Sequence, residues 1–349
     1  MKAVFITEHG GSDRLTLGDL PDPTPARNEV VVRVRACAVN HIDLWVRQGL
    51  PFLKVHFPHI LGGDISGEVI ATGLDARGWQ LGQRVVVNGL ISCGRCLLCL
   101  SGRDNLCRRA AIIGEDLPGG YAEFVKVPNE NLVPLADSIS FESAAAVGGV
   151  FVTAWAMLFN KARLRPGEWV LIHSVGSGVG SAAAQLALLT GANVIGTCGT
   201  DKKMSQAAKM GIKHLIHSRE RDFLREVRRI TAKSGVDVII EHIGEDVWAR
   251  SLCALAPGGR LVTCGSSSGH HPRIDLRRVF YEELQIQGVK FSSKAALFRI
   301  LRLLEAGRVS AVIDRVLPLS AARDAHQALA NREVFGKIVL VPERGRIEP

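Results

Sequence analysis

The sequence predicts a two-domain α/β protein in which a mostly-β domain is joined to a doubly wound parallel sheet. A chain of 349 residues is too long for a single ordinary core. Its first ~140 residues read as short strands separated by Gly, Pro and Asp. After Arg165, strands and helices alternate about every 25 residues, which predicts a parallel sheet with right-handed crossovers.

The first domain is expected to comprise residues 1–148, and the stretch from 290 to 349 is expected to fold back on it. Its segments with strand character are Glu29–Ala38, Asp64–Thr72 and Gln83–Asn88, with a last strand at Lys337–Val341.

The second domain is expected to comprise residues 149–289. Trp169–Ser174 (WVLIHS) is a continuous apolar run, as expected of a strand buried on both faces. Upstream, the apolar stretch Ala144–Phe159 is shorter than the ~20 residues of a membrane span and rich in Ala and Gly, so we expect a buried helix. Further strands are expected at Asn193–Thr197, His214–His217, Val236–Glu241 and Arg260–Cys264.

A glycine-rich segment, Val175–Gly180, joins the strand at Trp169–Ser174 to a predicted helix. Glycines there let a pyrophosphate approach the backbone, and the helix N-terminus supplies free amides and positive potential. A tight strand–helix turn can use the same residues for structural reasons alone. The strand before it, the helix after it and the βα units beyond favour dinucleotide binding.

Four cysteines, Cys93, Cys96, Cys99 and Cys107, follow the spacing C-x2-C-x2-C-x7-C. Four thiolates that converge on one point favour a closed structural zinc site. An iron–sulfur cluster fits less well, because its usual last gap is about three residues and is followed by proline. A disulfide pair is the other alternative, but the first residues contain no apolar signal core, which favours a reducing cytosol and metal binding.

The net charge of +9 raises the question of a nucleic-acid partner. The densest basic run, Arg219–Arg229, is interrupted by acids, which is typical of a solvated helix face. Aromatic residues make up 5% of the chain, and no aromatic-rich strand for stacking bases is present. Nucleic-acid binding is therefore not expected as a main role.

The end of the second strand of this domain, Asn193–Thr197, indicates which dinucleotide binds. Enzymes that prefer NAD place Asp or Glu at this point, whereas a 2′-phosphate needs cations and hydroxyls. No acid stands at the strand tip, and Thr200, Lys202 or Lys203 are candidates to hold a phosphate. Alternatively the lysines are merely exposed and Asp201 caps the helix. We favour NADP(H).

Together these motifs resemble the medium-chain dehydrogenase/reductase superfamily from Met1 to about Val341. The cysteine spacing resembles the structural-zinc motif of zinc-type alcohol dehydrogenases, whereas GTDKKMSQAAKMG, DVWARSL and GSSSG resemble quinone oxidoreductases. The resemblance implies a GroES-like catalytic domain with a cysteine lobe at 90–110, and a Rossmann dinucleotide-binding domain. The cofactor-binding residues expected from the loop and the resemblance are Thr153, Gly176, Gly178, Val179, Gly180, Thr200, Lys203, Gly265 and Ser266.

The resemblance places the catalytic-zinc ligands of alcohol dehydrogenases at Asn40, Gly63 and Gly149, and their proton relay at Ile42 and Trp45. An amide and two glycines do not hold zinc with useful affinity. The alcohol-polarising metal is therefore expected to be missing.

A rebuilt metal site from His41, Asp43, His59 and Asp64 is the alternative. The competing interpretation is that the two acids accept hydrogen bonds, His59 packs in its turn, and His41 faces the cofactor. We favour the competing interpretation, because a functional metal site needs open geometry and ordered neighbours.

Without a Lewis acid, hydride transfer requires an acceptor that needs little electrophilic help. The prediction is therefore an NADPH-dependent reductase of a quinone or α,β-unsaturated carbonyl. Its candidate catalytic residues are Asn40 as donor to the acceptor oxygen, His41, and Asp43, with the proton supplied either by His41 or by water. Two alternatives stay open: a zinc-dependent alcohol dehydrogenase with a non-standard metal site, and a non-catalytic nucleotide-binding protein that contacts RNA or a partner.

The expected cofactors are NADP(H) and one structural zinc ion per chain. The resemblance implies a homodimer or homotetramer paired through the edge strand of the Rossmann sheet. A cytoplasmic location without membrane association is expected.

Overall fold

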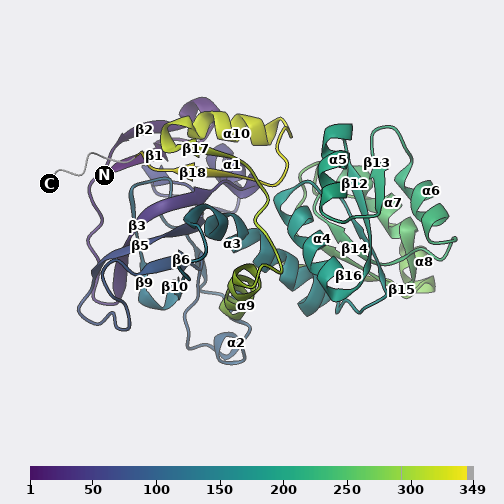
Figure 1. Ribbon diagram of the computed structural model, residues 1–349, viewed down its shortest axis with the longest axis horizontal. Helices are drawn as coiled ribbons and strands as arrows, with labels where there is room; N and C mark the ends of the chain where they lie inside the picture. Colours follow the sequence, from purple (N-terminus) through teal and green to yellow (C-terminus); the bar gives the residue numbers. More distant parts are fainter. Residues whose placement is uncertain (292, 344–349) are drawn as a thin grey trace. The chain divides into compact units, whose positions relative to one another are not determined.

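The computed structural model describes residues 1–291 and 293–343 and divides into two compact units (Figure 1). Unit 1 comprises Met1–Gly149 together with the C-terminal part of the chain from Ser293. Unit 2 begins at Val150 and ends before Ser293.

The main sheet of unit 1 has seven strands in the order β10-β6-β5-β3-β18-β17, with β9 also paired to β3. The strand β18 pairs antiparallel with the end of β3, where Val339 faces Ala38, so the C-terminal segment folds back as predicted. These strands are β3 (Glu29–Ala38), β5 (Asp64–Thr72), β6 (Arg84–Val87), β9 (Phe124–Pro128), β10 (Leu132–Pro134), β17 (Ile313–Pro318) and β18 (Lys337–Val341).

Smaller elements complete unit 1. A three-stranded sheet has the order β2-β1-β4, and β7 pairs with β8. Their bounds are β1 (Lys2–Ile6), β2 (Thr16–Asp19), β4 (His59–Ile60), β7 (Leu90–Ile91) and β8 (Ala111–Ile112). The α-helices are α1 (His41–Gln48), α2 (Leu97–Leu100), α9 (Lys294–Glu305) and α10 (Ala322–Ala330). Short 3₁₀ turns lie at Ser12–Arg14, Asp104–Leu106, Asn129–Asn131 and Leu319–Ala321.

The alternation in β3 places one face of the sheet in the core of unit 1. Val30, Val32 and Val34 are buried, whereas Arg33 and Arg35 are exposed. A strand with period two presents every second side chain to the same face, so these valines join the main hydrophobic cluster. The end of β3 leads directly into Asn40 and α1, which fixes the start of this helix against the sheet.

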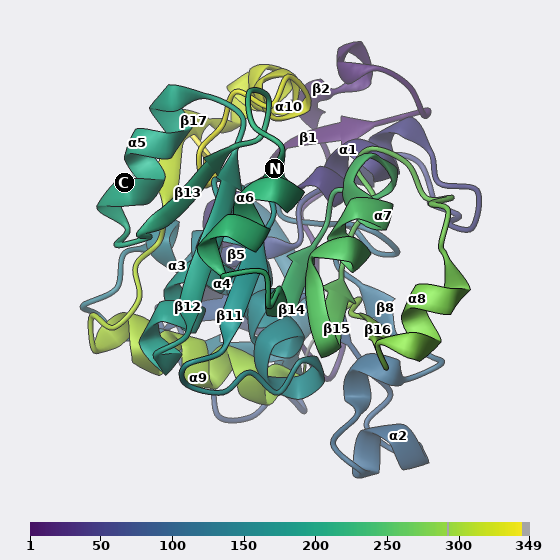
Figure 2. The same ribbon diagram turned by 90° about the vertical axis from the view of Figure 1, so that its right-hand side faces the viewer.

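Unit 2 is a six-stranded parallel sheet in the order β13-β12-β11-β14-β15-β16 (Figure 2). This order reverses at β11, as expected of a doubly wound sheet. Its strands are β11 (Trp169–Ile172), β12 (Asn193–Cys198), β13 (His214–His217), β14 (Val236–Glu241), β15 (Leu255–Thr263) and β16 (Gln285–Gly288). Its helices are α4 (Gly178–Thr190), α5 (Asp201–Lys209), α6 (Phe223–Ile230), α7 (Glu245–Ala254) and α8 (Leu276–Tyr281).

The strand β11 is buried on both faces. Leu171 packs in a cluster with Phe223 of α6 and Trp248 of α7. Its neighbours Val170 and Ile172 point to the other face and are equally buried. Continuous apolar runs are therefore required of the central strands, which is why they are recognisable in the sequence.

The strand β15 begins at Leu255, five residues earlier than the predicted start at Arg260. Leu255 pairs with Val236, and the register shifts before Val238 pairs with Arg260. An irregularity of this kind accommodates the Pro-Gly-Gly segment inside the strand, and the sequence reads there as a turn.

The predicted buried helix at Ala144–Phe159 is present but longer than expected. The helix α3 (Phe141–Trp155) continues into a π-helical segment, η4 (Ala156–Lys161). The 21 residues Phe141–Lys161 would suffice, by length and composition alone, to cross a membrane. Within the protein, 67% of their most apolar window is buried, as in the core helix of a folded domain.

Candidate active site and metal centre

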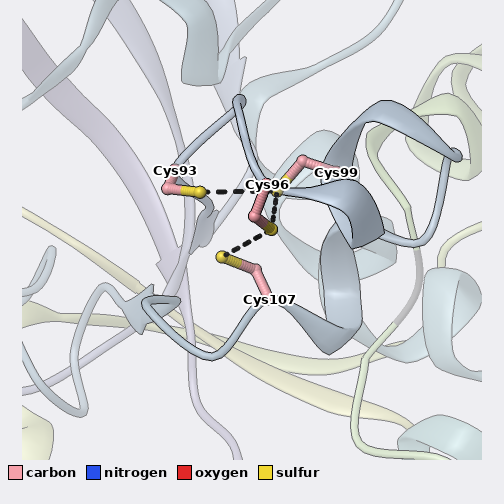
Figure 3. Close-up of side chains that lie close together, drawn as sticks. All are labelled: Cys93, Cys96, Cys99 and Cys107. Carbon is pink, nitrogen blue, oxygen red and sulfur yellow. Dashed lines mark hydrogen bonds between the residues drawn. The ribbon is translucent and has the colours of Figure 1, made fainter.

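Four cysteine side chains converge in unit 1 (Figure 3). The Sγ atoms of Cys93, Cys96, Cys99 and Cys107 all lie within 4.8 Å of one another. The Sγ–Sγ distance is 3.4 Å for Cys96–Cys99 and 3.9 Å for both Cys93–Cys99 and Cys96–Cys107. Four thiolates about 2.3 Å from a central zinc ion lie about 3.8 Å apart, so this donor set fits tetrahedral zinc.

Short local elements position the four sulfur atoms. Cys96 precedes α2, Cys99 lies within it, and Cys107 follows the 3₁₀ turn Asp104–Leu106. All four cysteines are free, and their separations are far longer than the about 2.0 Å of a disulfide. Arg109 lies beside the cluster, and its hydrogen bond to Cys93 raises the pKa of its guanidinium. Because four protein ligands fill the coordination sphere of zinc, this site suits a structural ion.

The glycine loop of unit 2 requires a residue without a side chain at Gly180. A Cβ there would lie 2.4 Å from the carbonyl oxygen of Ser174 and 2.9 Å from Cα of Val175. Ser177 caps α4, and its Oγ accepts a hydrogen bond from the Gly180 amide at 2.9 Å. The predicted residues Gly176, Gly178 and Val179 lie in the same loop and first helical turn. A helix N-terminus that begins in such a tight turn suits a pyrophosphate.

Three loops meet at the carboxyl edge of this sheet. Ser177 Oγ lies 3.0 Å from His242 Nε2, which follows β14. The His242 carbonyl accepts a hydrogen bond from Ser267 at 3.3 Å, and a Cβ on Gly265 would lie 3.2 Å from the same oxygen. The predicted residues Gly265 and Ser266 therefore adjoin the loop that contacts the glycine loop. Parallel α/β sheets bind ligands at this edge.

The end of β12 is polar and basic. Thr200 caps α5, because its Oγ1 accepts a hydrogen bond from the Lys203 amide at 3.3 Å, and Asp201 lies in the first turn. The alternative in which Asp201 is the N-cap is therefore wrong. A Cβ on Gly199 would lie 3.4 Å from Nε of Arg219, so this guanidinium lies over Gly199.

Thr153 lies within α3 and is half-buried. Its assignment to the cofactor site stays a prediction.

Asn40 lies at the centre of a polar network in unit 1. Its Nδ2 donates to Asp64 Oδ2 at 2.8 Å, and its Oδ1 accepts from Lys337 Nζ at 2.5 Å. Lys337 also donates to the Val39 carbonyl at 2.7 Å and lies 3.5 Å from Asp64 Oδ2. The other oxygen of Asp64 accepts the Gly149 amide at 2.9 Å. These contacts fix the amide of Asn40 from both sides.

Asp43 is buried beneath Asn40 and holds the start of α1. Its Oδ2 accepts hydrogen bonds from the backbone N–H of Asn40 at 2.8 Å and from the Tyr121 hydroxyl at 3.0 Å. Burial raises the pKa of Asp43 to about 6, against the effect of these hydrogen bonds and of Lys337. Only 1% of Asp43 is exposed, so it positions Asn40 and does not itself reach a substrate.

Tyr121 links Asp43 to His326 of α10. The Tyr121 hydroxyl donates to the carboxylate, so Nε2 of His326, 3.2 Å away, is the donor to the hydroxyl oxygen. Burial and the charge of Arg47 lower the pKa of His326 to about 3. The imidazole is therefore neutral with its proton on Nε2, and among the described residues Nδ1 has no partner.

His41 is the first residue of α1 and its side chain is exposed. Although it reaches solvent, the protein packed around it lowers its pKa to about 4, with further contributions from Lys337 and Arg332. The imidazole is neutral near pH 7. It can donate or accept a hydrogen bond but is not a store of protons at this pH.

The positions expected to hold a catalytic zinc in alcohol dehydrogenases are closely packed. A Cβ on Gly63 would lie 2.7 Å from the Ile113 carbonyl oxygen, and one on Gly149 would lie 2.6 Å from Asp64 Oδ1. His59 is buried, with Nε2 3.3 Å from the Gly114 carbonyl. In the part of the chain that the structure describes, the four cysteines form the one group of three or more His, Cys, Asp or Glu ligands that converge. Among the described residues, the ligand atoms of His41, Asp43, His59 and Asp64 do not converge into such a group.

Sequence reasoning missed Lys337, Tyr121, His326 and Arg219. Lys337 is separated from Asn40 by 297 residues and His326 from Tyr121 by 205. No local pattern joins residues so far apart. The one available signal was a lysine and a histidine inside apolar segments, since buried ionisable groups need partners.

Comparison with known proteins gives a consistent result over the whole chain. Residues 26–137 match the alcohol dehydrogenase GroES-like domain, and residues 178–306 match the zinc-binding dehydrogenase family. The chain is 28% identical to the quinone oxidoreductase of Homo sapiens, with 98% of each chain covered. It is 30% identical to an NAD-dependent alcohol dehydrogenase of Saccharolobus solfataricus, with 98% of this chain and 100% of the relative covered.

Solved structures agree with these relatives. The structure of an NAD-dependent alcohol dehydrogenase matches with a TM-score of 0.95 and 44% identity, covering 98% of this chain and 100% of the other. A 2-octenoyl-CoA carboxylase reductase in complex with NADP and 2-octenoyl-CoA matches with a TM-score of 0.87 and 25% identity, covering 96% and 84%. With its GroES-like unit, its parallel-sheet unit and its four-cysteine cluster, the chain belongs to the medium-chain dehydrogenase/reductase superfamily and is an oxidoreductase.

Proposed function

We propose that the protein is an NADPH-dependent reductase of quinones or α,β-unsaturated carbonyls that uses no catalytic zinc. The observation that carries this proposal is the amide of Asn40, which stands where alcohol dehydrogenases are expected to hold a zinc ligand and is fixed between Lys337 and Asp64. Gly63 and Gly149 offer no ligand atoms at the other two positions. A hydrogen-bond donor therefore replaces a Lewis acid.

Asn40 is proposed to bind the oxygen of the acceptor. Its Oδ1 is occupied by Lys337 and one hydrogen of Nδ2 by Asp64, so the second hydrogen of Nδ2 is available for donation. Bound NADPH supplies the hydride. A donor held in place stabilises negative charge on the acceptor oxygen as it develops, which suits quinones and enones because their charge is delocalised.

The product oxygen or carbon then needs a proton. Because the pKa of His41 is lowered to about 4, this imidazole is neutral at pH 7, and we assign the proton to water that His41 orients by a hydrogen bond. Asp43 is buried and holds the backbone N–H of Asn40. On this proposal, replacing His41 by Asn lowers the rate only modestly, whereas replacing Asn40 by Ala lowers it strongly.

The preference for NADPH over NADH is proposed from the end of β12. The Thr200 hydroxyl caps α5, Lys203 lies in the first turn of this helix, and the guanidinium of Arg219 lies over Gly199. Asp201 is the nearest acid along the chain. A 2′-phosphate is favoured by hydroxyl and guanidinium donors. Fluorescence titration of NADPH and NADH tests this: the Arg219→Ala and Lys203→Ala variants should weaken NADPH binding and leave NADH binding nearly unchanged. Equal affinity of the native protein for both dinucleotides would contradict it.

The reaction itself is tested by stopped-flow mixing of NADPH with a panel of quinones and enones. Primary and secondary alcohols with NADP⁺ serve as the opposing panel, with and without a chelator. Reduction of quinones or enones that resists chelation supports the proposal. Alcohol oxidation that is lost on chelation, with inert enones, would refute it.

A zinc-dependent alcohol dehydrogenase is the second candidate, because the solved structure at 44% identity carries the name of an NAD-dependent alcohol dehydrogenase. Metal analysis of the purified protein separates the two candidates. We propose one zinc ion per chain, held by Cys93, Cys96, Cys99 and Cys107. Two zinc ions per chain would favour the alcohol dehydrogenase.

We further propose that the protein is a cytoplasmic homodimer or homotetramer paired through β16. This strand is the edge of the six-stranded sheet, and Ile286 on it is exposed. The adjacent helix α8 exposes Leu276, Phe280 and Tyr281. An edge strand beside exposed apolar side chains is commonly covered by a partner.

A further inference from the structure

A buried ammonium group lies directly behind the amide of Asn40. Lys337 is the first residue of β18, and its side chain is 5% exposed. Because β18 pairs with the last residues of β3, Lys337 reaches the chain segment that follows β3. Its Nζ donates to Asn40 Oδ1 at 2.5 Å and to the Val39 carbonyl at 2.7 Å.

The two neighbours of the Asn40 amide leave it one orientation. An ammonium group can only donate hydrogen bonds, and a carboxylate can only accept them. With Lys337 on one side and Asp64 on the other, Oδ1 must face Lys337 and Nδ2 must face Asp64. The reversed amide would present hydrogens to the ammonium and an oxygen to the carboxylate, so both contacts would become repulsive.

We propose that Lys337 is a positioning residue for hydride transfer, which locks and polarises the Asn40 amide so that its remaining N–H binds the acceptor oxygen. This inference rests on the proposed reductase function. A cation on the carbonyl oxygen of an amide draws electron density from its nitrogen, and hydrogen bonds in a chain strengthen one another. Lys337 thereby supplies part of the positive charge that a zinc ion supplies elsewhere, without touching the substrate.

The distances favour this role over simple neutralisation of Asp64. Lys337 Nζ is 2.5 Å from the amide oxygen of Asn40 but 3.5 Å from the carboxylate of Asp64. The Asp64 carboxylate already accepts hydrogen bonds from the side-chain amide of Asn40 and from the backbone N–H of Gly149. Lys337 therefore acts on Asp64 mainly through Asn40.

A double-mutant cycle tests the inference. The variants are Lys337→Met, Asn40→Ala and the double variant, assayed by kcat and KM for an accepted quinone or enone and by the Kd of NADPH. Asn40→Ala should lower kcat about 100-fold, the usual effect of removing one donor to a developing oxyanion. Lys337→Met should lower kcat about 10-fold alone but have almost no further effect when Asn40 is already alanine, because it acts through that residue. The Kd of NADPH should stay unchanged in all three variants.

A loss of the same size in both backgrounds would overturn the inference, because a structural contribution does not depend on Asn40. Lys337→Arg should restore part of kcat, since a guanidinium can also donate to Oδ1. Lys337→Met alone leaves the buried charge of Asp64 without its neighbouring cation and can unfold the protein. In that case the double variant Lys337→Met, Asp64→Asn, which removes both buried charges, is assayed instead. Lys2→Met is the matched control, because Lys2 forms an exposed ion pair with Asp19.

The proposed function and the inference fail in different ways. If Asn40→Ala leaves the rate unchanged, the donor role of Asn40 in the proposed function is wrong. If Asn40→Ala lowers the rate and Lys337→Met does not, only the role of Lys337 is wrong.

Discussion

Replacing Asp43 by asparagine is expected to stabilise α1 at neutral pH. The carboxylate is 1% exposed, and burial raises its pKa from 3.8 to about 6. Moving a pKa by this much corresponds to about 3 kcal/mol of unfavourable free energy when the group is ionised in the folded protein. Asparagine keeps both hydrogen bonds, because the backbone N–H of Asn40 and the Tyr121 hydroxyl donate to the same oxygen, Oδ2.

The sign of the pH dependence follows from the raised pKa. The folded protein binds a proton on Asp43 more tightly than the unfolded chain, so the destabilisation is fully present above about pH 6. It decreases as the pH falls from 6 to 3.8 and is lost below 3.8, where the carboxyl group is protonated in both states. The Asp43→Asn variant should lack this dependence, and the difference between the two proteins should shrink on acidification.

Hydrogen exchange of the peptide that covers α1, compared between the native protein and Asp43→Asn at equal pH, measures this difference. At pH 7.5 exchange should be slower in the variant, by a factor of up to about 100 for 3 kcal/mol. At pH 4.5 most of the difference should be gone. Asp137→Asn is the control, because the side chain of Asp137 is 98% exposed. Faster exchange in Asp43→Asn at pH 7.5, or a difference independent of pH, would refute the reasoning.

Three further predictions concern the metal centre, the cofactor loop and the closed catalytic-metal position. Cys99→Ser should reduce zinc from one ion per chain to near zero by mass spectrometry of the metal and leave the Kd of NADPH unchanged, whereas a retained ion would contradict the four-thiolate site. Gly180→Ala should weaken NADPH binding at least about 10-fold by titration, because the new Cβ would lie 2.4 Å from a backbone oxygen. Gly288→Ala is the control and should leave NADPH binding unchanged, because its Cβ would have no neighbouring atom within 4 Å. Introducing Gly63→His and Gly149→Cys together should not add a second zinc ion and should lower the melting temperature, since both new Cβ atoms would lie within 2.7 Å of oxygen atoms. A second zinc ion bound by that variant would contradict this prediction, because it would show that the two positions can accommodate ligand side chains.

Local sequence signals were sufficient for the elements they describe. The strands β3, β5 and β14 have the predicted bounds, since alternation or continuous apolar character is written into consecutive residues. The cysteine cluster was equally readable, because its four ligands lie within 15 residues and the intervening chain is too short to separate them. The start of β15 at Leu255 was not readable, because a strand that contains Pro-Gly-Gly carries the signals of a turn.

The sequence by itself determined the superfamily, the two kinds of domain and the cluster of four cysteines, and the resemblance places Asn40, Gly63 and Gly149 where alcohol dehydrogenases hold a catalytic zinc. Only the tertiary structure decided what stands at that position now. Lys337 and Asp64 come from distant strands to fix the amide of Asn40. The physical reason is that ligand identity is a property of single residues, whereas the orientation of an amide depends on charged neighbours that the sheet brings together from opposite ends of the chain.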